Sequence, residues 1–234
     1  MELSDNEVTD LVTLNAPILC LDTCSILDLI RAATNENANP IEFVASLTLL
    51  KKMESGYDLR ALLAQQVYDE LEDNLPNVQK EAETALDKWK LRLDKMDTIM
   101  ETFGATAKAD IAHWDGHVGR AALLANRMAS ATVRAPAPTD VAQKVFSRAG
   151  RAITPARRGK ESMKDCIVIE TYLASIANLR NQGLTAKVVF VSSNIRDYAG
   201  ENGVKLKPDL AAEFAALSME YAPNMGAAKF MLGI

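Results

Sequence analysis

The sequence predicts an α/β protein with a parallel sheet of about four to five strands and a helical insertion. Short apolar runs alternate with helical patterns, which favours parallel strands joined by right-handed crossovers. Polar and acidic residues follow these runs at their carboxyl ends. Residues 76–159 show helical spacing and no strand pattern. We therefore expect a core of residues 1–75 and 160–234, and an insertion or arm at 76–159 that ends in a basic loop.

The first core segment begins with a lead-in that is loose or helical and continues with two strands and three helices. The expected strand at 17–22 is continuously apolar until it stops on Asp22, as is typical of a strand buried on both faces. Gly56 is expected to end the second helix, because glycine is favoured just after a helix. The expected elements, in order, are the lead-in at 1–15, a strand at 17–22, helices at 23–33 and 41–55, a strand at 59–64 and a helix that starts at 65.

The insertion is predicted to consist of helices, a connector at 134–139 and a closing basic loop. Residues 76–103 keep apolar positions three and four apart for about seven turns, which corresponds to a helix roughly 40 Å long. Further helices are expected at 110–131 and 140–149, before the basic loop at 150–160. The second core segment then predicts a helix at 162–182, a strand at 187–192, a helix within 206–217, a short strand at 219–222 and a terminal helix at 226–232.

The bulk composition is that of an ordinary globular domain. Hydrophobic residues make up 48% of the chain and charged residues 24%. No apolar run approaches 18 residues, so no transmembrane helix is expected. The amino terminus is acidic and lacks the pattern of a secretory signal, and three cysteines do not suggest a disulfide framework. These features predict a cytoplasmic protein.

The distribution of charge is uneven. The net charge is −5, yet the stretch from Arg134 to Lys164 holds eight basic residues and two acids, a balance of +6 that leaves −11 for the rest. A polyanion would be drawn to this one stretch and repelled elsewhere.

Four carboxylates are placed so that they could converge. Asp22, Glu70 and Asp197 follow predicted strands, and Asp165 lies near the start of a helix. Because parallel strands end at one edge of a sheet, these groups can meet there. Clustered carboxylates favour a cation among them, and oxygen ligands suit Mg²⁺ or Mn²⁺. The alternative is that Asp22 is only a helix cap and that the other acids favour helix starts for dipole reasons.

Four short motifs resemble those of PIN-domain nucleases, in the order seen in that family. They are Leu21-Asp-Thr-Cys-Ser-Ile-Leu, Val67-Tyr-Asp-Glu-Leu, Lys164-Asp-Cys-Ile-Val-Ile-Glu and Phe190-Val-Ser-Ser-Asn-Ile-Arg-Asp-Tyr. The resemblance covers the two flanks, about 150 residues, and leaves the insertion unaccounted for. The basic loop before Lys164 resembles the larger bacterial PIN-like branch. The resemblance implies a three-layer α/β/α fold.

The resemblance also implies roles for individual residues. Asp22, Glu70, Asp165 and Asp197 would be the catalytic metal ligands, with Asp69 as the alternative to Glu70. Ser192 and Asn194 would support the site by holding water or phosphate. If Asn194 instead stands in the place of the family's acid, the second metal site loses a charge. The residues expected to grip the substrate backbone are Arg157, Arg158, Lys160 and Lys164; the alternative for this loop is a solvated basic segment.

The implied function is cleavage of RNA phosphodiester bonds by an endonuclease that uses Mg²⁺ or Mn²⁺ to activate water. Two alternatives remain: a PIN-like module that binds RNA or protein without cleaving, and a structure-selective DNA nuclease whose insertion clamps the strand. An antitoxin or regulatory protein and a second copy joined through the long helix are further expected partners. A simple packed insertion is the alternative for that helix.

Other reactive residues are given structural roles. His113 and His117 are four residues apart, but no third ligand is apparent, so a packing or surface role is favoured. The three cysteines, Cys20, Cys24 and Cys166, flank the proposed acids without the spacing of a zinc site and are expected to be small buried side chains. Glu170 should lie off the site and either pair with a basic residue or contact the rim.

Overall fold

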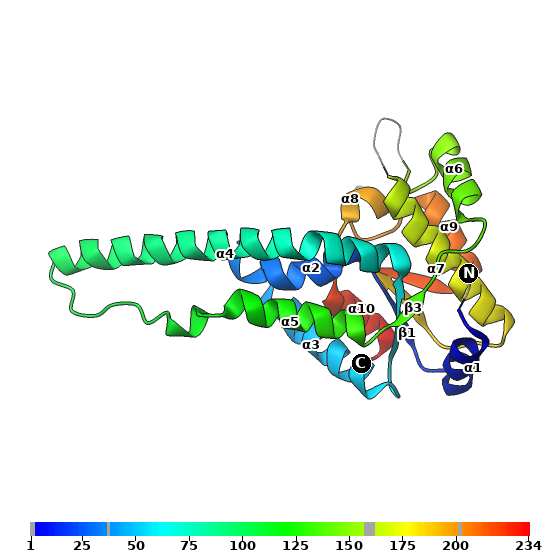
Figure 1. Ribbon diagram of the computed structural model, residues 1–234, viewed down its shortest axis with the longest axis horizontal. Helices are drawn as coiled ribbons and strands as arrows, with labels where there is room; N and C mark the ends of the chain where they lie inside the picture. The colour runs from blue at the N-terminus through cyan, green and yellow to red at the C-terminus, as the bar shows by residue number, and fades with distance from the viewer. Residues whose placement is uncertain (1–2, 37, 157–161, 201–202) are drawn as a thin grey trace.

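The computed structural model describes residues 3–36, 38–156, 162–200 and 203–234. Its centre is a five-stranded sheet in the order β3-β2-β1-β4-β5, and every pairing is parallel (Figure 1). The predicted α/β class is therefore confirmed. The strands are β1 (Ile18–Leu21), β2 (Arg60–Ala64), β3 (Val133–Ala135), β4 (Val188–Val191) and β5 (Met219–Ala222).

Helices cover both faces of this sheet, as the three-layer prediction requires. α7 packs on β2 and β3, whereas α3 and α10 pack on the opposite side, against β2, β4 and β5 (Figure 1). No described helix combines the length and the apolar character needed to cross a bilayer. The α-helices are α1 (Asp5–Leu14), α2 (Thr23–Arg31), α3 (Pro40–Ser55), α4 (Gln65–Thr102), α5 (His117–Ser130), α6 (Val141–Arg151), α7 (Met163–Asn181), α8 (Ile195–Tyr198), α9 (Pro208–Ala216) and α10 (Met225–Leu232); two 3₁₀ turns are η1 (Ala32–Thr34) and η2 (Ala112–Trp114).

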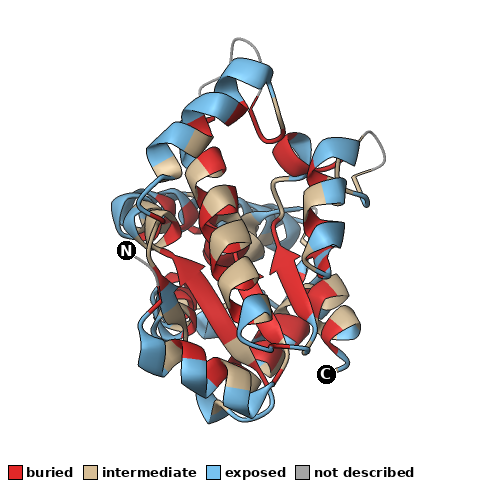
Figure 2. Ribbon diagram, turned by 90° about the vertical axis from the view of Figure 1, so that its right-hand side faces the viewer, coloured by how far each residue is buried: buried red, intermediate tan, exposed pale blue. Residues whose placement is uncertain are grey.

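The core lies between the layers and explains why the strands are short apolar runs. Every residue of β1 and β4 is buried, and Figure 2 shows these strands enclosed by helices whose outer sides are exposed. Phe190 in β4 contacts four aromatic rings, those of Tyr172, Tyr198, Phe214 and Tyr221. Because both faces are covered, polar side chains can reach solvent only at the sheet edges and strand ends.

A single helix replaces the two that the sequence suggested after residue 65. α4 runs without interruption through Pro76 and, at 38 residues, is about 57 Å long. Proline removes one backbone hydrogen bond inside a helix. Buried residues on both sides of Pro76, Leu71 and Val78 among them, hold the two halves against the body of the protein. Beyond Leu86 the helix leaves the body, and residues 88–116 form a projecting arm (Figure 1).

One expectation about the insertion is wrong. Residues 76–159 were predicted to contain no strand, but β3 lies within them and pairs with β2. β3 has three residues, one of them Arg134, so its pattern is too short to stand out from the sequence. The helix expected from residue 110 also begins only at His117, because Gly116 adopts a left-handed conformation with φ of 67°. The division of the chain at residues 75 and 160 stays a prediction.

A buried tyrosine joins the carboxyl ends of β1 and β2. Tyr172 of α7 is fully buried, and its hydroxyl donates to the carbonyl of Leu21 at 2.5 Å. The same oxygen accepts a hydrogen bond from the backbone N–H of Ala64 at 3.0 Å. Leu21 and Ala64 are the last residues of their strands. Tyr172 therefore fixes where the chain leaves the sheet toward Asp22 and toward α4.

The Tyr172→Phe variant tests this bridge. Loss of the hydroxyl leaves the buried Ala64 N–H unpaired, so we expect the free energy of unfolding to fall by about 1–3 kcal/mol. Urea denaturation measures the change. Tyr57→Phe, at a tyrosine that is 77% exposed, is the control and should change stability by less than about 0.5 kcal/mol. Equal urea denaturation midpoints for Tyr172→Phe and Tyr57→Phe would contradict the structural role of Tyr172.

Candidate functional site

Asp22 lies directly after β1 and is buried, with 5% of its surface exposed. Its Oδ1 accepts a hydrogen bond from the backbone N–H of Thr23 at 2.9 Å, so it does cap α2. Its Oδ2 accepts from the Ser192 hydroxyl at 2.5 Å and from the Cys24 thiol at 3.0 Å. The Asp22 side chain therefore caps α2 and also places a carboxylate at the carboxyl end of β1.

Glu70 reaches the same place from the first turns of α4. The Thr23 hydroxyl donates to its Oε2 at 2.9 Å, and the Gln66 amide donates to its Oε1 at 3.1 Å. Asp69, the alternative to Glu70, is exposed and accepts from Gln65 instead. Since Thr23 also binds Asp22, the structure brings Glu70 rather than Asp69 to the end of β1.

The segment after β4 supplies the third acid. Asp197 is 2% exposed, and its Oδ2 accepts from the Asn194 amide at 2.7 Å. Asn194 therefore contacts Asp197 directly, and which of the two stands in the place of the family's acid stays a prediction. Ser192 is fully buried, and its hydroxyl binds Asp22. Both residues thus contact the predicted acids, while their predicted contact with water or phosphate stays a prediction.

Asp165 joins the group through a tyrosine that the sequence analysis did not single out. Asp165 lies in the first turn of α7, and the Tyr198 hydroxyl lies 3.5 Å from its Oδ1. Burial raises the pKa of Tyr198 well above its usual value, and the charges of Asp22, Asp165 and Glu70 raise it further. The phenol therefore lies within electrostatic range of three of the four predicted acids. Its position directly after Asp197 was the signal available in the sequence.

Burial, and to a lesser extent the neighbouring negative charges, raise the pKa values of Asp22 and Glu70. Burial raises the pKa of Asp22, three hydrogen bonds oppose this, and the negative charge of Asp197 raises it further. Burial also raises the pKa of Glu70, and the negative charge of Asp22 adds to this rise. The hydrogen bond from Thr23 and the positive charge of Lys164 act in the opposite direction and lower the pKa of Glu70. Excess negative charge is therefore concentrated at this edge of the sheet.

The donor set fits a hard divalent cation by its chemistry, because all four side chains offer carboxylate oxygens and the site has surplus negative charge. In the part of the chain that the structure describes, however, no three Asp, Glu, His or Cys side chains are gathered closely enough to hold one ion directly. Mg²⁺ usually keeps several water molecules and is bound through one or two carboxylates, so a preformed cage is not required.

The predicted substrate-binding residues are only partly within the structure. Arg157, Arg158 and Lys160 lie outside the described residues. Lys164 is exposed, directly precedes Asp165 and is close enough to Glu70 to lower the pKa of that carboxyl. A cation is thus present at the rim of the carboxylate cluster.

The stretch before residue 157 is anchored by a buried arginine. Arg148 of α6 is 3% exposed and donates to Glu170 of α7 at 2.8 Å and to Glu213 of α9 at 2.9 Å. It also donates to the carbonyl of Thr154. The expectation that Glu170 pairs with a basic residue is therefore confirmed, and α6 is held against the helix that carries Asp165.

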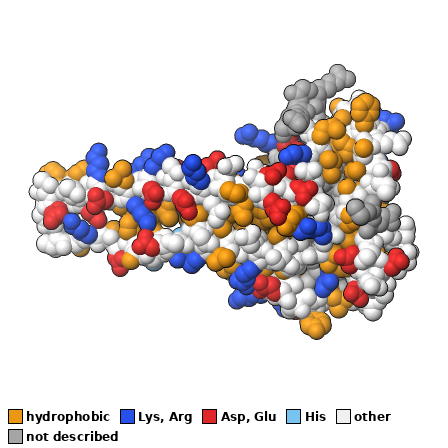
Figure 3. Space-filling view, in the orientation of Figure 1, with side chains coloured by type: hydrophobic (Ala, Val, Ile, Leu, Met, Phe, Trp, Pro, Cys, Tyr) orange, Lys and Arg blue, Asp and Glu red, His pale blue; other side chains and the backbone are white. Residues whose placement is uncertain are grey.

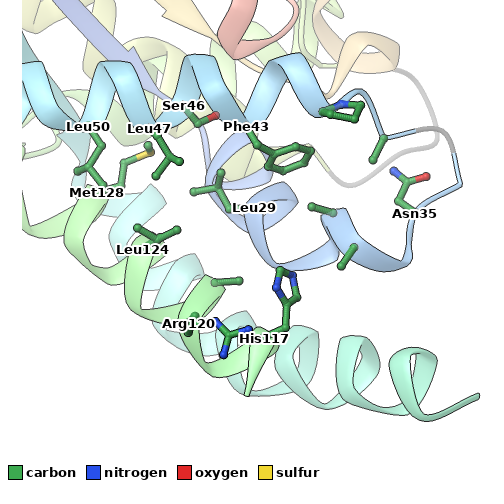
Figure 4. A pocket seen from close by; sticks show the side chains of 15 residues that line it. Leu29, Asn35, Phe43, Ser46, Leu47, Leu50, His117, Arg120, Leu124 and Met128 are labelled. Atoms are coloured by element: carbon green, nitrogen blue, oxygen red, sulfur yellow. The ribbon is translucent and has the colours of Figure 1, made fainter. Parts of the chain in front are cut away.

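The other reactive residues lie elsewhere or pack as expected. His113 and His117 belong to different elements, η2 and α5, so they do not share a helix face. His117 lines an apolar cavity of about 520 Å³ between α2, α3 and α5 (Figure 4), and none of the four acids lines it. Cys20 and Cys166 are buried, whereas Cys24 is partly exposed and contacts Asp22.

Comparison with known proteins agrees with this arrangement. A protein-family model described as a PIN domain matches residues 19–198, which include the ends of β1, β2 and β4 and all four acids. No curated protein and no solved structure shows a significant match to the chain.

The raised pKa of Asp22 predicts how stability depends on pH. A carboxyl whose pKa is higher in the folded state than in the unfolded chain destabilises the fold as pH rises through the folded value. Asp22→Asn should therefore be more stable than the wild type at pH 7.5 in the absence of metal, and this gain should vanish below about pH 4, near the pKa of an unfolded Asp. Thermal unfolding across this pH range measures it.

The matched control is Asp69→Asn, which changes an exposed carboxyl one residue from Glu70. It should leave stability within about 0.5 kcal/mol at every pH. If the stability difference between Asp22→Asn and the wild type grew as the pH fell, the raised pKa of Asp22 would be contradicted.

Proposed function

The chain belongs to the PIN-domain family, and from that membership we propose that it is a divalent-metal-dependent nuclease that hydrolyses phosphodiester bonds in RNA. The proposed metal ion is Mg²⁺ or Mn²⁺. The proposed ligands are the carboxylates of Asp22, Glu70, Asp165 and Asp197, bound directly or through water.

The observation that carries this proposal is the convergence of acids from separate elements around one buried phenol. Asp22 follows β1, Glu70 lies in the second turn of α4 and Asp165 lies in the first turn of α7. The negative charge of each adds to the effect of burial in raising the pKa of Tyr198, whose hydroxyl lies 3.5 Å from Asp165. A purely structural role gives no reason to place three like charges around one buried group, because their repulsion raises the free energy of the fold. A divalent cation would relieve that repulsion.

The chain's own residues hold these acids in place. The hydroxyls of Ser192 and Thr23 donate to Asp22 and Glu70, and the Asn194 amide donates to Asp197. A bound divalent cation would lower the pKa of water and stabilise charge on the phosphodiester oxygens. Lys164, at the rim beside Glu70, is proposed to bind a phosphate of the substrate, together with the predicted Arg157, Arg158 and Lys160.

Two variants test the active-site assignment. Asp22→Asn and Asp165→Asn each remove a proposed metal-binding charge, so we expect kcat for RNA cleavage in Mn²⁺ to fall by about 100-fold or more, with the circular dichroism spectrum unchanged. Glu72→Gln, at an exposed acid of α4, is the control and should cleave like the wild type. Undiminished cleavage by either site variant would refute the assignment.

The substrate is settled by parallel assays on single-stranded RNA, single-stranded DNA and flapped duplex DNA. Faster cleavage of RNA supports the proposal. Preference for the flapped duplex would support the structure-selective DNA nuclease, and binding of RNA without cleavage in either metal would support the non-catalytic module.

Metal binding is a separate prediction. A ligand that binds only the folded protein stabilises it, by about 2.7 kcal/mol at a concentration 100 times its Kd. We therefore expect Mn²⁺ and Mg²⁺ to raise the Tm of the wild type and to give a binding isotherm by calorimetry, and Asp22→Asn to lose both effects. Equal Tm shifts in the two proteins would place the metal elsewhere, and the absence of any shift in the wild type would contradict metal binding.

A further inference from the structure

One face of α4 links the carboxylate site to the arm. Lys88 follows Glu70 by 18 residues, about five full turns, so the two side chains leave the helix in nearly the same direction. Arg92 and Lys95 lie within about 40° of that direction. All three basic residues are exposed. The helix that positions Glu70 therefore also carries a row of cations, the basic row, formed by Lys88, Arg92 and Lys95.

The acids of the arm lie on another side and are partly engaged within the arm. Asp97 accepts a hydrogen bond from the backbone N–H of Ala109, and Glu101 pairs with Lys108 at 3.2 Å. Among the described residues, none of the three cations of the basic row forms an ion pair. Figure 3 shows Lys and Arg side chains along the upper edge of the arm, the side on which Figure 1 places α8. The arm thus presents unneutralised positive charge on the side of the candidate site.

The surface between the site and the basic row is polar and open. Four exposed residues of α4 continue the same face: Asn74, Asn77, Glu81 and Thr84. Glu81 is the one carboxylate among them. Leu91, which is 70% exposed, projects about 60° from the direction of Glu70 and borders the basic row. The four residues of this face between Glu70 and Lys88 are polar, so an extended polar ligand can lie along it.

The distance along α4 from Glu70 to the basic row is comparable to one turn of a nucleic-acid duplex. At 1.5 Å per residue, Lys88 and Lys95 lie about 27 and 38 Å along the axis from Glu70. An RNA stem is A-form and rises less per base pair than B-form DNA, whose turn measures about 34–36 Å, so this span covers about one turn of a stem. Proteins that bind single strands use aromatic side chains on which bases stack. The aromatic side chain nearest the row in sequence is Trp89, which projects about 100° from the direction of Glu70 and whose ring lies under the Arg92 guanidinium, 5.6 Å from its centroid. A straight row of cations beside one covered ring matches recognition of a helical backbone by shape and charge more closely than it matches base stacking.

We propose that the basic row binds the phosphate backbone of a double-helical stem about one turn from the site, so that the substrate is an RNA whose cleaved segment adjoins a stem. This inference rests on the proposed function. Because α4 is continuous from Gln65 to Thr102, the distance between the two contacts is fixed by one helix. The arm then selects substrates by stem length and not by sequence.

The test compares two double variants on two RNA hairpins. Lys88→Gln/Lys95→Gln removes two charges from the basic row. Lys90→Gln/Lys108→Gln removes two charges elsewhere in the arm, and Lys90 lies about 160° from the direction of Glu70. The hairpins share one single-stranded flank and have stems of about 12 or about 4 base pairs, so that only the longer spans one turn. Fluorescence anisotropy with EDTA measures binding by the full chain across a salt series.

We expect the Lys88→Gln/Lys95→Gln variant to bind the long stem about tenfold more weakly than the wild type at low salt, with the slope of log K against log salt reduced by about 2. Its binding to the short stem should match that of the wild type, and the control variant should match the wild type on both hairpins. An unchanged slope on the long stem, or an equal loss on both stems, would overturn the proposal.

Cleavage assays in Mn²⁺ separate this inference from the proposed function. If the wild type and both double variants cleave both hairpins alike, the arm contact is wrong and the nuclease proposal stands. If the variants differ in binding the long stem as expected but no protein cleaves either RNA, the arm contact is supported and the nuclease proposal fails.

Discussion

Burial of the Asp22 carboxylate is the constraint on which the rest of this edge of the sheet depends. The side chain is 5% exposed, and a buried charge without partners is strongly unfavourable. Its hydrogen-bond partners come from two segments that are far apart in the sequence. Thr23 and Cys24 follow Asp22 directly, and Ser192 follows β4. The ends of β1 and β4 must therefore stay in register for the fold to tolerate this residue. The parallel pairing of Leu21 with Val191 provides that register.

Much of this edge could be predicted from local sequence, because its elements are defined by local patterns. The apolar run before Asp22 is continuous and the acid follows it directly, whereas the run before Gln65 is interrupted by Arg60, and Glu70 follows in the second turn of the next helix. What could not be predicted depends on contacts between distant residues. β3 is a strand because Leu62 pairs with Val133, and the sequence of β3 alone gives no sign of that pairing. The bridge made by Tyr172 and the position of Tyr198 beside Asp165 likewise join elements far apart in the chain.

The choice between Glu70 and Asp69 illustrates the same limit. Adjacent residues on a helix point about 100° apart, so only one of them can face β1. Local sequence does not say which, since both are acids in the same turn. The register of α4 against α2 decides it, and Thr23 makes the contact with Glu70. The helix direction that brings Glu70 to the site also sets the direction of the basic row further along α4.

The side chains that bind the acids explain why a cation from solution suits this site better than one from the protein. Ser192, Thr23 and Asn194 are neutral donors, so they orient the carboxylates without cancelling their charge. The Cys24 thiol is also neutral, because burial and the nearby Asp22 raise its pKa. Arg148, a buried cation of α6, is already paired with Glu170 and Glu213. Lys164 is exposed and offsets only part of the negative charge. The protein thus holds its acids in position while leaving the charge that a divalent ion would neutralise.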